Sequence, residues 1–530
     1  MASKMDAPTL KRALSDGREI ALIDVREHGQ FGEGHLFFAV PLAYSRFELG
    51  LPTLVPNTSV RLVLCDAGDG VAERAARRAE ALGYDNVAVL EGGIAAWQGA
   101  GYTLYAGVNV PSKTFGELVE AARHTPRLSP GQVAAMREAK ENVVIVDGRP
   151  FAEYSKMNIP GGICCPNGDL PLRIGAIAPD PNTTIIVNCA GRTRSIIGAQ
   201  MLIDFGVPNP VYALENGTQG WFLGGLPLEH GANRRAAAAA SEKELAQLGA
   251  RARAQAQKHG VEFVGTEAAR AWLGERGRTT YCLDVRSPEE FAAAAVPGFA
   301  SAPGGQLIQA TDQWVGVKGA RLLLIDDEGV RAPVVAGWLR QSGHEASVLE
   351  GGAAAARDLR LPRLSPRPPV GAEPSLLAAG EASLALARGN LSIIDLRSSL
   401  AYRQGHIAGA VWSIRPRLAE AVVGAAARTV LLVAEEPGIA RLAAIDLAEA
   451  GCTDVRYIAE GPEAWAAAGL GLAASPNAPA DAARIDFLFF TAKRHEGTAE
   501  AAEAARQYLA WEVGLLNQLD AQERGAFPIA

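Results

Sequence analysis

Cys189 stands between a predicted buried strand and a predicted helix. Residues 185–188 are Ile-Ile-Val-Asn, a short apolar run typical of a strand. Beyond the intervening loop, Ile197, Met201 and Phe205 recur at helical spacing, and Gly206 is placed to end that helix. A cysteine at such a turn faces free backbone N–H groups and the positive end of the helix dipole. This setting predicts a reactive thiolate that handles anions.

The loop that Cys189 opens supplies further groups for this chemistry. A free thiol titrates near pH ~8.5, and a helix N-terminus lowers that pKa by about one unit. The remaining stabilisation of a thiolate is expected from Arg192 and Arg194, which would also form a cationic mouth for an anionic substrate. The alternative is an inert buried cysteine, a common fate for this residue type. The glycine, arginines, threonine and serine of the loop favour the reactive thiol. The candidate site is Cys189, Ala190, Gly191, Arg192, Thr193, Arg194 and Ser195.

Composition limits the classes of protein. The chain has 530 residues, a length that favours several domains, and 48% apolar residues, enough for each to form a core. A net charge of −7 argues against nucleic acid as a partner. Six cysteines are too few for a disulfide framework. No signal peptide or membrane-spanning run is evident. We therefore expect a cytoplasmic protein without nucleic-acid or membrane partners.

A repeated pattern divides the chain into four copies of one unit. Each copy has Asp-x-Arg after an apolar strand and a Glu-led glycine turn after a later strand. The alternation of strands and helices predicts four α/β domains, each with a parallel sheet between helices. The Asp-x-Arg motifs begin at Asp24, Asp147, Asp284 and Asp395, and the turns begin at Glu91, Glu215, Glu350 and Glu460.

The other three copies lack a sulfur at the position of Cys189. At the spacing that separates Asp147 from Cys189, the first copy has Asp66 and the third has Asp326. Counting back from Glu460 places Ala434 there in the fourth copy. The carboxylates of these loops would repel an anionic substrate, so only the second copy is expected to be catalytic. Cys65 lies one position before Asp66, and a shift of one residue would place it in the loop.

The expected domain limits follow from the repeats and from Pro- or Ala-rich connectors. Residues 361–369 read as a stiff proline-rich spacer, and residues 236–258 as a charged linker helix. An apolar stripe over residues 498–524 predicts a helix that docks on the protein or forms a homodimer. The limits are 1–106 for domain 1, 107–232 for domain 2, 233–366 for the linker and domain 3, 367–476 for domain 4, and 477–530 for a helical tail.

The loop Cys-x4-Arg-Ser resembles the active-site loop of rhodanese-type sulfurtransferases. The flanking Asp147-Gly-Arg149, Ile159-Pro-Gly-Gly162 and Glu215-Asn-Gly217 are similar to that family's motifs. Some bacterial members carry several such domains and a tail of this kind. The resemblance implies a persulfide on Cys189, cradled by the loop N–H groups. It also implies a small anionic sulfur donor such as thiosulfate and a thiol or cyanide acceptor, with neither metal nor organic cofactor.

Other functions stay open at this point. Phosphatases and arsenate reductases of the same fold have a loop that resembles Cys-x5-Arg, which is one residue longer than this loop. A sulfur carrier or scaffold would make the three sulfur-free copies the important ones. Mercaptopyruvate-type enzymes have a loop that resembles Cys-Gly-x-Gly-x-Thr, and the loop of this chain does not match that pattern. Cys164 and Cys165 are a potential sulfur relay, but packing is favoured, because adjacent cysteines rarely face one pocket.

Overall fold

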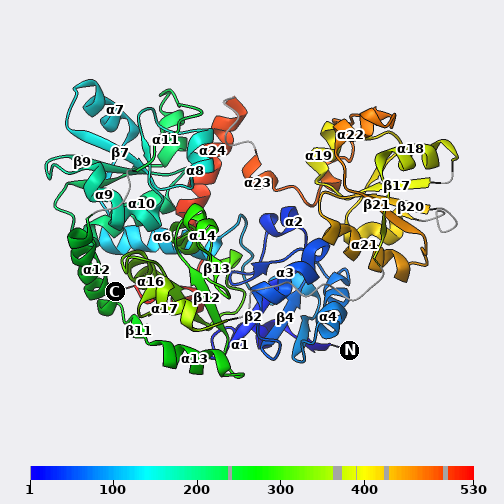
Figure 1. The fold of residues 1–530 in the computed structure, drawn as a ribbon, viewed down its shortest axis with the longest axis horizontal. Helices are drawn as coiled ribbons and strands as arrows, with labels where there is room; N and C mark the ends of the chain where they lie inside the picture. The colour runs from blue at the N-terminus through cyan, green and yellow to red at the C-terminus, as the bar shows by residue number, and fades with distance from the viewer. Residues whose placement is uncertain are drawn as a thin grey trace. The chain divides into compact units, whose positions relative to one another are not determined.

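The computed structural model describes residues 2–236, 241–361, 373–389, 391–422, 429–492 and 499–529 (Figure 1). The chain forms two compact units, each of which is described by itself. Unit 1 comprises Met1–Arg12, Ala21–Gly107 and Pro366–Phe489. Unit 2 comprises Ala13–Ile20, Val108–Ser365 and Phe490–Ala530. Apart from Ala13–Ile20, the first repeat belongs to the same unit as the fourth, and the second and third repeats belong to the other unit.

Each repeat forms a five-stranded parallel sheet, as predicted, and the four sheets share one strand order. The sheet of domain 2, in order across the sheet, consists of β6 (Arg127–Leu128), β10 (Val211–Leu214), β9 (Thr184–Asn188), β7 (Val143–Asp147) and β8 (Ile163–Cys164). That of domain 3 consists of β11 (Glu262–Val264), β15 (Glu345–Leu349), β14 (Arg321–Ile325), β12 (Thr280–Asp284) and β13 (Ala300–Ser301).

The sheets of unit 1 follow the same plan. In domain 1 the order is β1 (Ser3–Met5), β5 (Val87–Leu90), β4 (Arg61–Cys65), β2 (Ile20–Asp24) and β3 (Val40–Pro41). In domain 4 it is β16 (Ser375–Leu376), β21 (Val455–Ile458), β20 (Thr429–Val433), β17 (Leu391–Asp395) and β19 (Val411–Trp412). A small antiparallel pair, β18 (His406–Ile407) with β22 (Leu472–Ala473), adds to domain 4.

Helices follow the strands in each repeat, as alternating patterns predict. Domain 1 has α1 (Ala7–Ala13), α2 (His28–Glu33), α3 (Phe47–Leu54), α4 (Val71–Ala81) and α5 (Gly93–Gly99). Domain 2 has α6 (Val110–Arg123), α7 (Pro130–Glu138), α8 (Phe151–Lys156), η2 (Asn167–Asp169), α9 (Leu170–Ile177), α10 (Thr193–Phe205) and α11 (Gly217–Leu223). Domain 3 has α13 (Thr266–Gly274), α14 (Pro288–Ala293), α15 (Gly304–Gln309), α16 (Arg331–Gln341) and α17 (Gly352–Asp358). Domain 4 has α18 (Ala379–Ala387), α19 (Ser399–Gln404), α20 (Leu418–Ala421), α21 (Pro437–Glu449) and α22 (Pro462–Ala467).

The connectors differ in part from expectation. The linker helix α12 is Glu242–Lys258, begins at the capping box of Ser241 and packs on α16; residues 237–240 lie outside the described part of the chain. The predicted proline-rich spacer falls on residues 362–369, which are also outside it. The tail predicted as one piece divides between the units: residues 477–489 lie in unit 1, whereas α24 (Ala499–Gly514) and α25 (Ala521–Arg524) lie in unit 2.

Every repeat keeps its Asp-x-Arg motif as a buried ion pair at the end of a central strand. Arg149 Nη2 lies 2.7 Å from Asp147 Oδ2 and also donates to the carbonyl of Met157. The same pair measures 2.6 Å in each of the other three domains. Because these groups hold the strand end to the following helix, the motif is structural.

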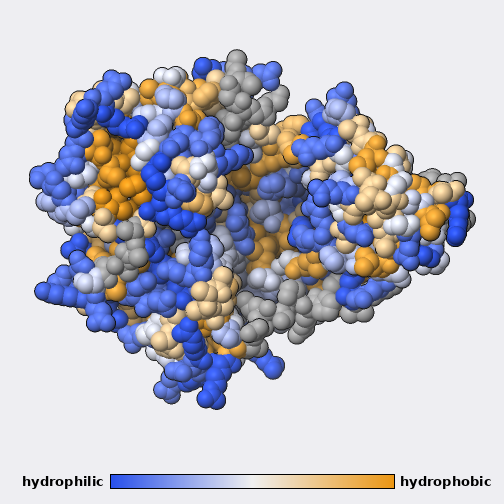
Figure 2. Space-filling view, turned by 45° about the horizontal axis from the view of Figure 1, so that its top comes forward, coloured by the Kyte–Doolittle hydropathy of each residue, from blue (hydrophilic) through white to orange (hydrophobic). Residues whose placement is uncertain are grey.

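The surface is mixed in character. On the face shown in Figure 2, hydrophilic residues are interspersed with smaller hydrophobic patches. Among the described residues, no helix has both the length and the apolar character needed to cross a membrane.

Candidate active site

The loop of domain 2 begins where β9 ends. The amide N–H of Gly148 donates to the carbonyl of Asn188, the last residue of β9. The same bond joins Val25 to Cys65, Val285 to Ile325 and Leu396 to Val433. Cys189, Asp66, Asp326 and Ala434 are thus equivalent, each directly after its central strand. Cys65 matches Asn188, so it belongs to the strand and not to the loop.

Cys189 is buried at the N-terminal end of α10. Its side chain is 2% exposed, and the hydroxyl of Ser195 donates a hydrogen bond to its sulfur at 3.0 Å. Helix α10 ends at Phe205, and Gly206, which the sequence predicted to end the helix, has the left-handed conformation. The thiol of Cys189 thus lies close to the start of α10 and beside a hydroxyl donor.

The Glu215-Asn-Gly turn closes the loop from the other side. The N–H of Thr218 donates to the carbonyl of Cys189 at 2.8 Å, and that of Gln219 donates to the carbonyl of Ala190 at 3.1 Å. Gly217 has φ +55°, and a Cβ there would lie 2.3 Å from the carbonyl oxygen of Cys189. Only glycine fits this contact. The turn therefore fixes the backbone of the reactive loop.

Arg194 lies beside the sulfur and is held by two side chains. Its guanidinium pairs with both carboxylate oxygens of Glu153, at 2.9 and 2.8 Å, and donates to Gln306 of domain 3 at 3.3 Å. Burial opposes the charge of Arg194, but Glu153 and Cys189 raise its pKa. Arg194 is therefore the loop arginine whose charge acts on Cys189.

Arg192 does not take the expected position. Its guanidinium pairs with Glu117 at 2.7 and 2.8 Å, and it also contacts Glu120 of the same helix, α6. Both loop arginines are thus paired with carboxylates, and the cationic mouth for an anionic substrate stays a prediction. The local sequence could not reveal this, since Glu117 lies 75 positions away from Arg192.

The tail helix α24 contributes a carboxylate that sequence reasoning missed. Glu512 Oε1 accepts a hydrogen bond from Thr193 Oγ1 at 2.7 Å. Tyr508 and Leu509, two members of the predicted apolar stripe, are buried within unit 2. The stripe was a signal for docking, but it did not indicate where the helix docks.

In domain 3 an aspartate, Asp326, occupies the position equivalent to Cys189. Both carboxylate oxygens of Asp326 accept backbone N–H groups, one from Gly329 at 3.1 Å and the other from Val330, Arg331 and Ala332 at 2.7–3.1 Å. Burial raises the pKa of Asp326, and these N–H groups oppose the rise. Because both oxygens accept, the anion is the form that fits. In domain 1, Asp66 likewise accepts from Gly68 and Ala72.

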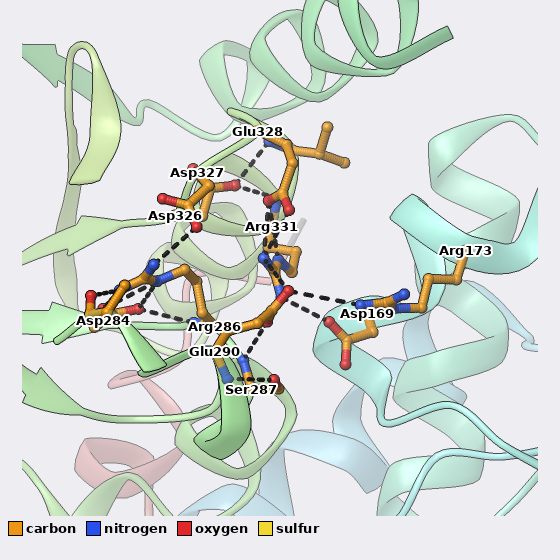
Figure 3. Close-up of polar contacts among 12 residues, drawn as sticks. Asp169, Arg173, Asp284, Arg286, Ser287, Glu290, Asp326, Asp327, Glu328 and Arg331 are labelled. Carbon is orange, nitrogen blue, oxygen red and sulfur yellow. Dashed lines mark hydrogen bonds and ion pairs between the residues drawn. The ribbon is translucent and has the colours of Figure 1, made fainter. Parts of the chain in front are cut away.

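Domain 3 also retains the arginine–glutamate pair. Arg331 corresponds to Arg194 and is fully buried; it pairs with Glu290, the counterpart of Glu153, at 2.6 Å (Figure 3). Arg331 also reaches Asp169 of domain 2 at 3.0 Å, just as Arg194 reaches Gln306 of domain 3. The two loops of unit 2 thus face each other across one interface, with matching contacts in both directions.

The other thiols lie in environments that disfavour a thiolate. Burial raises the pKa of Cys164 and of Cys282 to about 12, and it also raises the pKa of Cys65, Cys165 and Cys452. Cys164 and Cys165 both border a cavity of about 480 Å³, but they pack in two separate core clusters, which agrees with the favoured packing role. Their protonation also makes them poor nucleophiles. Among the described residues, no three His, Cys, Asp or Glu side chains are grouped to hold a metal ion.

Comparison with known proteins agrees with the four-repeat architecture. The sequence model of the rhodanese-like domain family matches this chain four times, at residues 6–100, 129–223, 266–358 and 378–468. The chain therefore belongs to the rhodanese family and contains four of its domains.

Two relatives differ greatly in how much of the chain they match. A thiosulfate sulfurtransferase from Pseudomonas aeruginosa, known from a crystal structure, is 41% identical in sequence to this chain. The match covers 100% of this chain and 99% of the other, and the two structures superpose with a TM-score of 0.90. An HTH-type transcriptional regulator, Rv0324 of Mycobacterium tuberculosis, is 34% identical over 96 residues. That match spans 18% of this chain and 41% of the regulator.

Proposed function

We propose that the protein is a sulfurtransferase in which Cys189 carries the transferred sulfur as a persulfide. The observation that carries this proposal is the carboxylate of Asp326, whose oxygens are bound by four loop N–H groups in the equivalent loop. That arrangement identifies the loop as an anion cradle. In domain 2 the same position belongs to a thiol, so the anion in the cradle would be sulfur.

The reaction proceeds in two displacement steps. The Cys189 thiolate attacks the outer sulfur of the donor, the donor's sulfur–sulfur bond breaks, and the remainder leaves with the electron pair. For thiosulfate the leaving group is sulfite. A thiophilic acceptor, a thiolate or cyanide, then attacks the outer sulfur of the persulfide and regenerates the Cys189 thiolate.

The loop residues act on the charge that appears in these steps. The backbone from Ala190 to Ser195 stabilises the anionic sulfur, as an oxyanion hole does. Ser195 donates to the sulfur, and Arg194 adds a positive charge held in place by Glu153. Arg192 and Thr193 act indirectly, by joining the loop to α6 and α24. The similarity to a thiosulfate sulfurtransferase over the whole chain supports thiosulfate as donor.

The test is Cys189→Ser. Thiocyanate formation from thiosulfate and cyanide should fall by more than a thousandfold, and intact mass after treatment with thiosulfate should gain one sulfur only in the wild type. Cys282→Ser is the matched control, because Cys282 is a buried strand thiol of another domain. Undiminished thiocyanate formation by Cys189→Ser, or a sulfur adduct on another cysteine, would refute the proposal.

A further inference from the structure

Three side chains converge on the outer side of Gly191 in the reactive loop. A Cβ at Gly191 would lie 3.3 Å from Glu512 Oε2, 3.4 Å from Gln219 Nε2 and 3.5 Å from Tyr508 Cε1. Glu512 and Tyr508 come from the tail helix α24, and Gln219 comes from α11. The loop that begins with Cys189 is thus bordered by groups from two separate elements.

Two of these side chains carry buried polar atoms without partners in the described part of the protein. Glu512 Oε2 and both side-chain atoms of Gln219 make no hydrogen bond, and each residue is only 2% exposed. Leaving such atoms unpaired is costly, and most of all for a carboxylate. A ligand that donates hydrogen bonds to Glu512 Oε2 and Gln219 Oε1 would remove the cost of leaving these two acceptors unpaired.

The rest of the environment restricts the charge of this ligand. Glu512 Oε1 is held by Thr193, so Oε2 has a fixed position beside the loop. Glu117 and Glu120 already pair with Arg192, and Glu153 already pairs with Arg194. Lys113 directs its charge at the rings of Tyr508 and Trp511, 4.6 and 5.2 Å from their centroids. The carboxylate of Glu512 therefore favours a cation and repels an anion at this point.

From this geometry we propose that Glu512 and Gln219 form the acceptor subsite, which selects a small thiol carrying an ammonium group. The inference rests on the proposed function, because the acceptor meets the persulfide of Cys189. The ammonium donates to Glu512 Oε2 and Gln219 Oε1, which orients the thiol toward Cys189. The acceptor's thiolate attacks the outer sulfur, the bond from that sulfur to Cys189 breaks, and Cys189 leaves as a thiolate. The transferred sulfur keeps its negative charge in the acceptor's persulfide, so the charges balance.

The experiment compares two nearly isosteric acceptors, cysteamine and 2-mercaptoethanol, with thiosulfate as donor. The measured quantity is the ratio of their kcat/KM values, in the full-length wild type and in Glu512→Gln. We expect this ratio to be at least tenfold lower in Glu512→Gln, since the variant keeps the shape of the side chain but loses its charge. Comparing this ratio between the two proteins cancels the difference in nucleophilicity between the two thiols, because that difference is the same in both proteins. Glu503→Gln is the matched control, because Glu503 is an exposed glutamate on the same helix.

Each outcome has a defined meaning. An equal ratio in wild type and Glu512→Gln would overturn the inference and would indicate that water fills the site. If Glu512→Gln does not fold, inhibition of the wild type decides: ethylammonium should compete with cysteamine, and ethanol at the same concentration should not. Failure of ethylammonium to compete would also overturn it. Absence of a sulfur adduct on wild-type Cys189 would instead contradict the proposed function itself.

Discussion

At the scale of single residues, Ser195 contacts the sulfur that we propose to be reactive, that of Cys189. Its hydroxyl lies 3.0 Å from the sulfur of Cys189, in a loop shielded from water. A hydrogen bond to a charged group contributes about 1.5–3 kcal/mol. Ser195 can make this hydrogen bond during the reaction only if the sulfur of the thiolate, or of the persulfide anion, stays where the sulfur of the thiol lies.

Ser195→Ala should therefore slow the loading of Cys189 by roughly 10- to 100-fold, the equivalent of that free energy. The rate is measured by single-turnover formation of the sulfur adduct. Ser195→Thr keeps the hydroxyl and serves as the comparison. A loading rate in Ser195→Ala equal to that of the wild type would mean that the serine has no role in stabilising the anion.

At the scale of elements, each domain brings a parallel strand, through a short loop, to the N-terminal end of a helix. In domains 1 and 3 the backbone N–H groups of the loop and of the helix start donate to an aspartate and so form a cradle for an anion. Domain 3 fills this cradle with its own carboxylate, whereas domain 2 places a thiol there. We expected the acidic loops to repel an anionic substrate. In domain 3 the carboxylate of Asp326 itself occupies the cradle in which such an anion would be bound.

Asp326→Ala should destabilise the folded protein by about 1–3 kcal/mol, because buried N–H groups lose their acceptor. Chemical unfolding monitored by tryptophan fluorescence measures the change. Asp326→Asn retains one side-chain oxygen and should cost less. If Asp326→Ala were as stable as the wild type, the N–H groups would not depend on this carboxylate, and the comparison with the Cys189 loop would lose its basis.

At the scale of the whole molecule, each unit is built from two domains that are not always neighbours in sequence. Domains 2 and 3 exchange equivalent contacts, from Arg194 to Gln306 and from Arg331 to Asp169. Gly168 and Gly305 lie at their contact, where a Cβ on Gly168 would be 2.8 Å from the amide nitrogen of Gly305. Domains 1 and 4 are joined by Arg415, which pairs with Glu48 at 2.7 Å. The domains without a cysteine at the loop start thus contact their partner domains through buried polar side chains.

The Arg331–Glu290 ion pair of domain 3, which lies beside the contact of Arg331 with Asp169 of domain 2, predicts a loss of stability in acid. Burial would raise the pKa of Glu290, but hydrogen bonds from Arg331 outweigh it and lower the pKa from 4.5 to about 2 (Figure 3). Because the folded value lies below the unfolded one, the stabilisation is present above about pH 4.5 and is lost as pH falls toward 2. Glu290→Gln should therefore lose less stability than the wild type between pH 5 and pH 3, in urea unfolding at each pH. An equal loss in both proteins would show that this pair does not contribute.

The sequence by itself determined the repeats, the parallel sheets, and the position of one cysteine and two aspartates at equivalent loops. These features are local: strand and helix periodicity, turn glycines and the spacing between motifs are all written within about 100 residues, the size of one domain. The end of α10 at Phe205 and the structural role of the Asp-x-Arg pairs belong to the same class.

Only the tertiary structure decided which charges reach the loop. The partners of Arg192 lie 75 and 72 positions away, that of Thr193 lies 319 positions away, and the domains pair as first with fourth and second with third. Spacing along the chain carries no information about such contacts, because they form where separate elements pack together. For that reason a loop with two arginines suggested a cationic site, and the folded chain surrounds it with carboxylates.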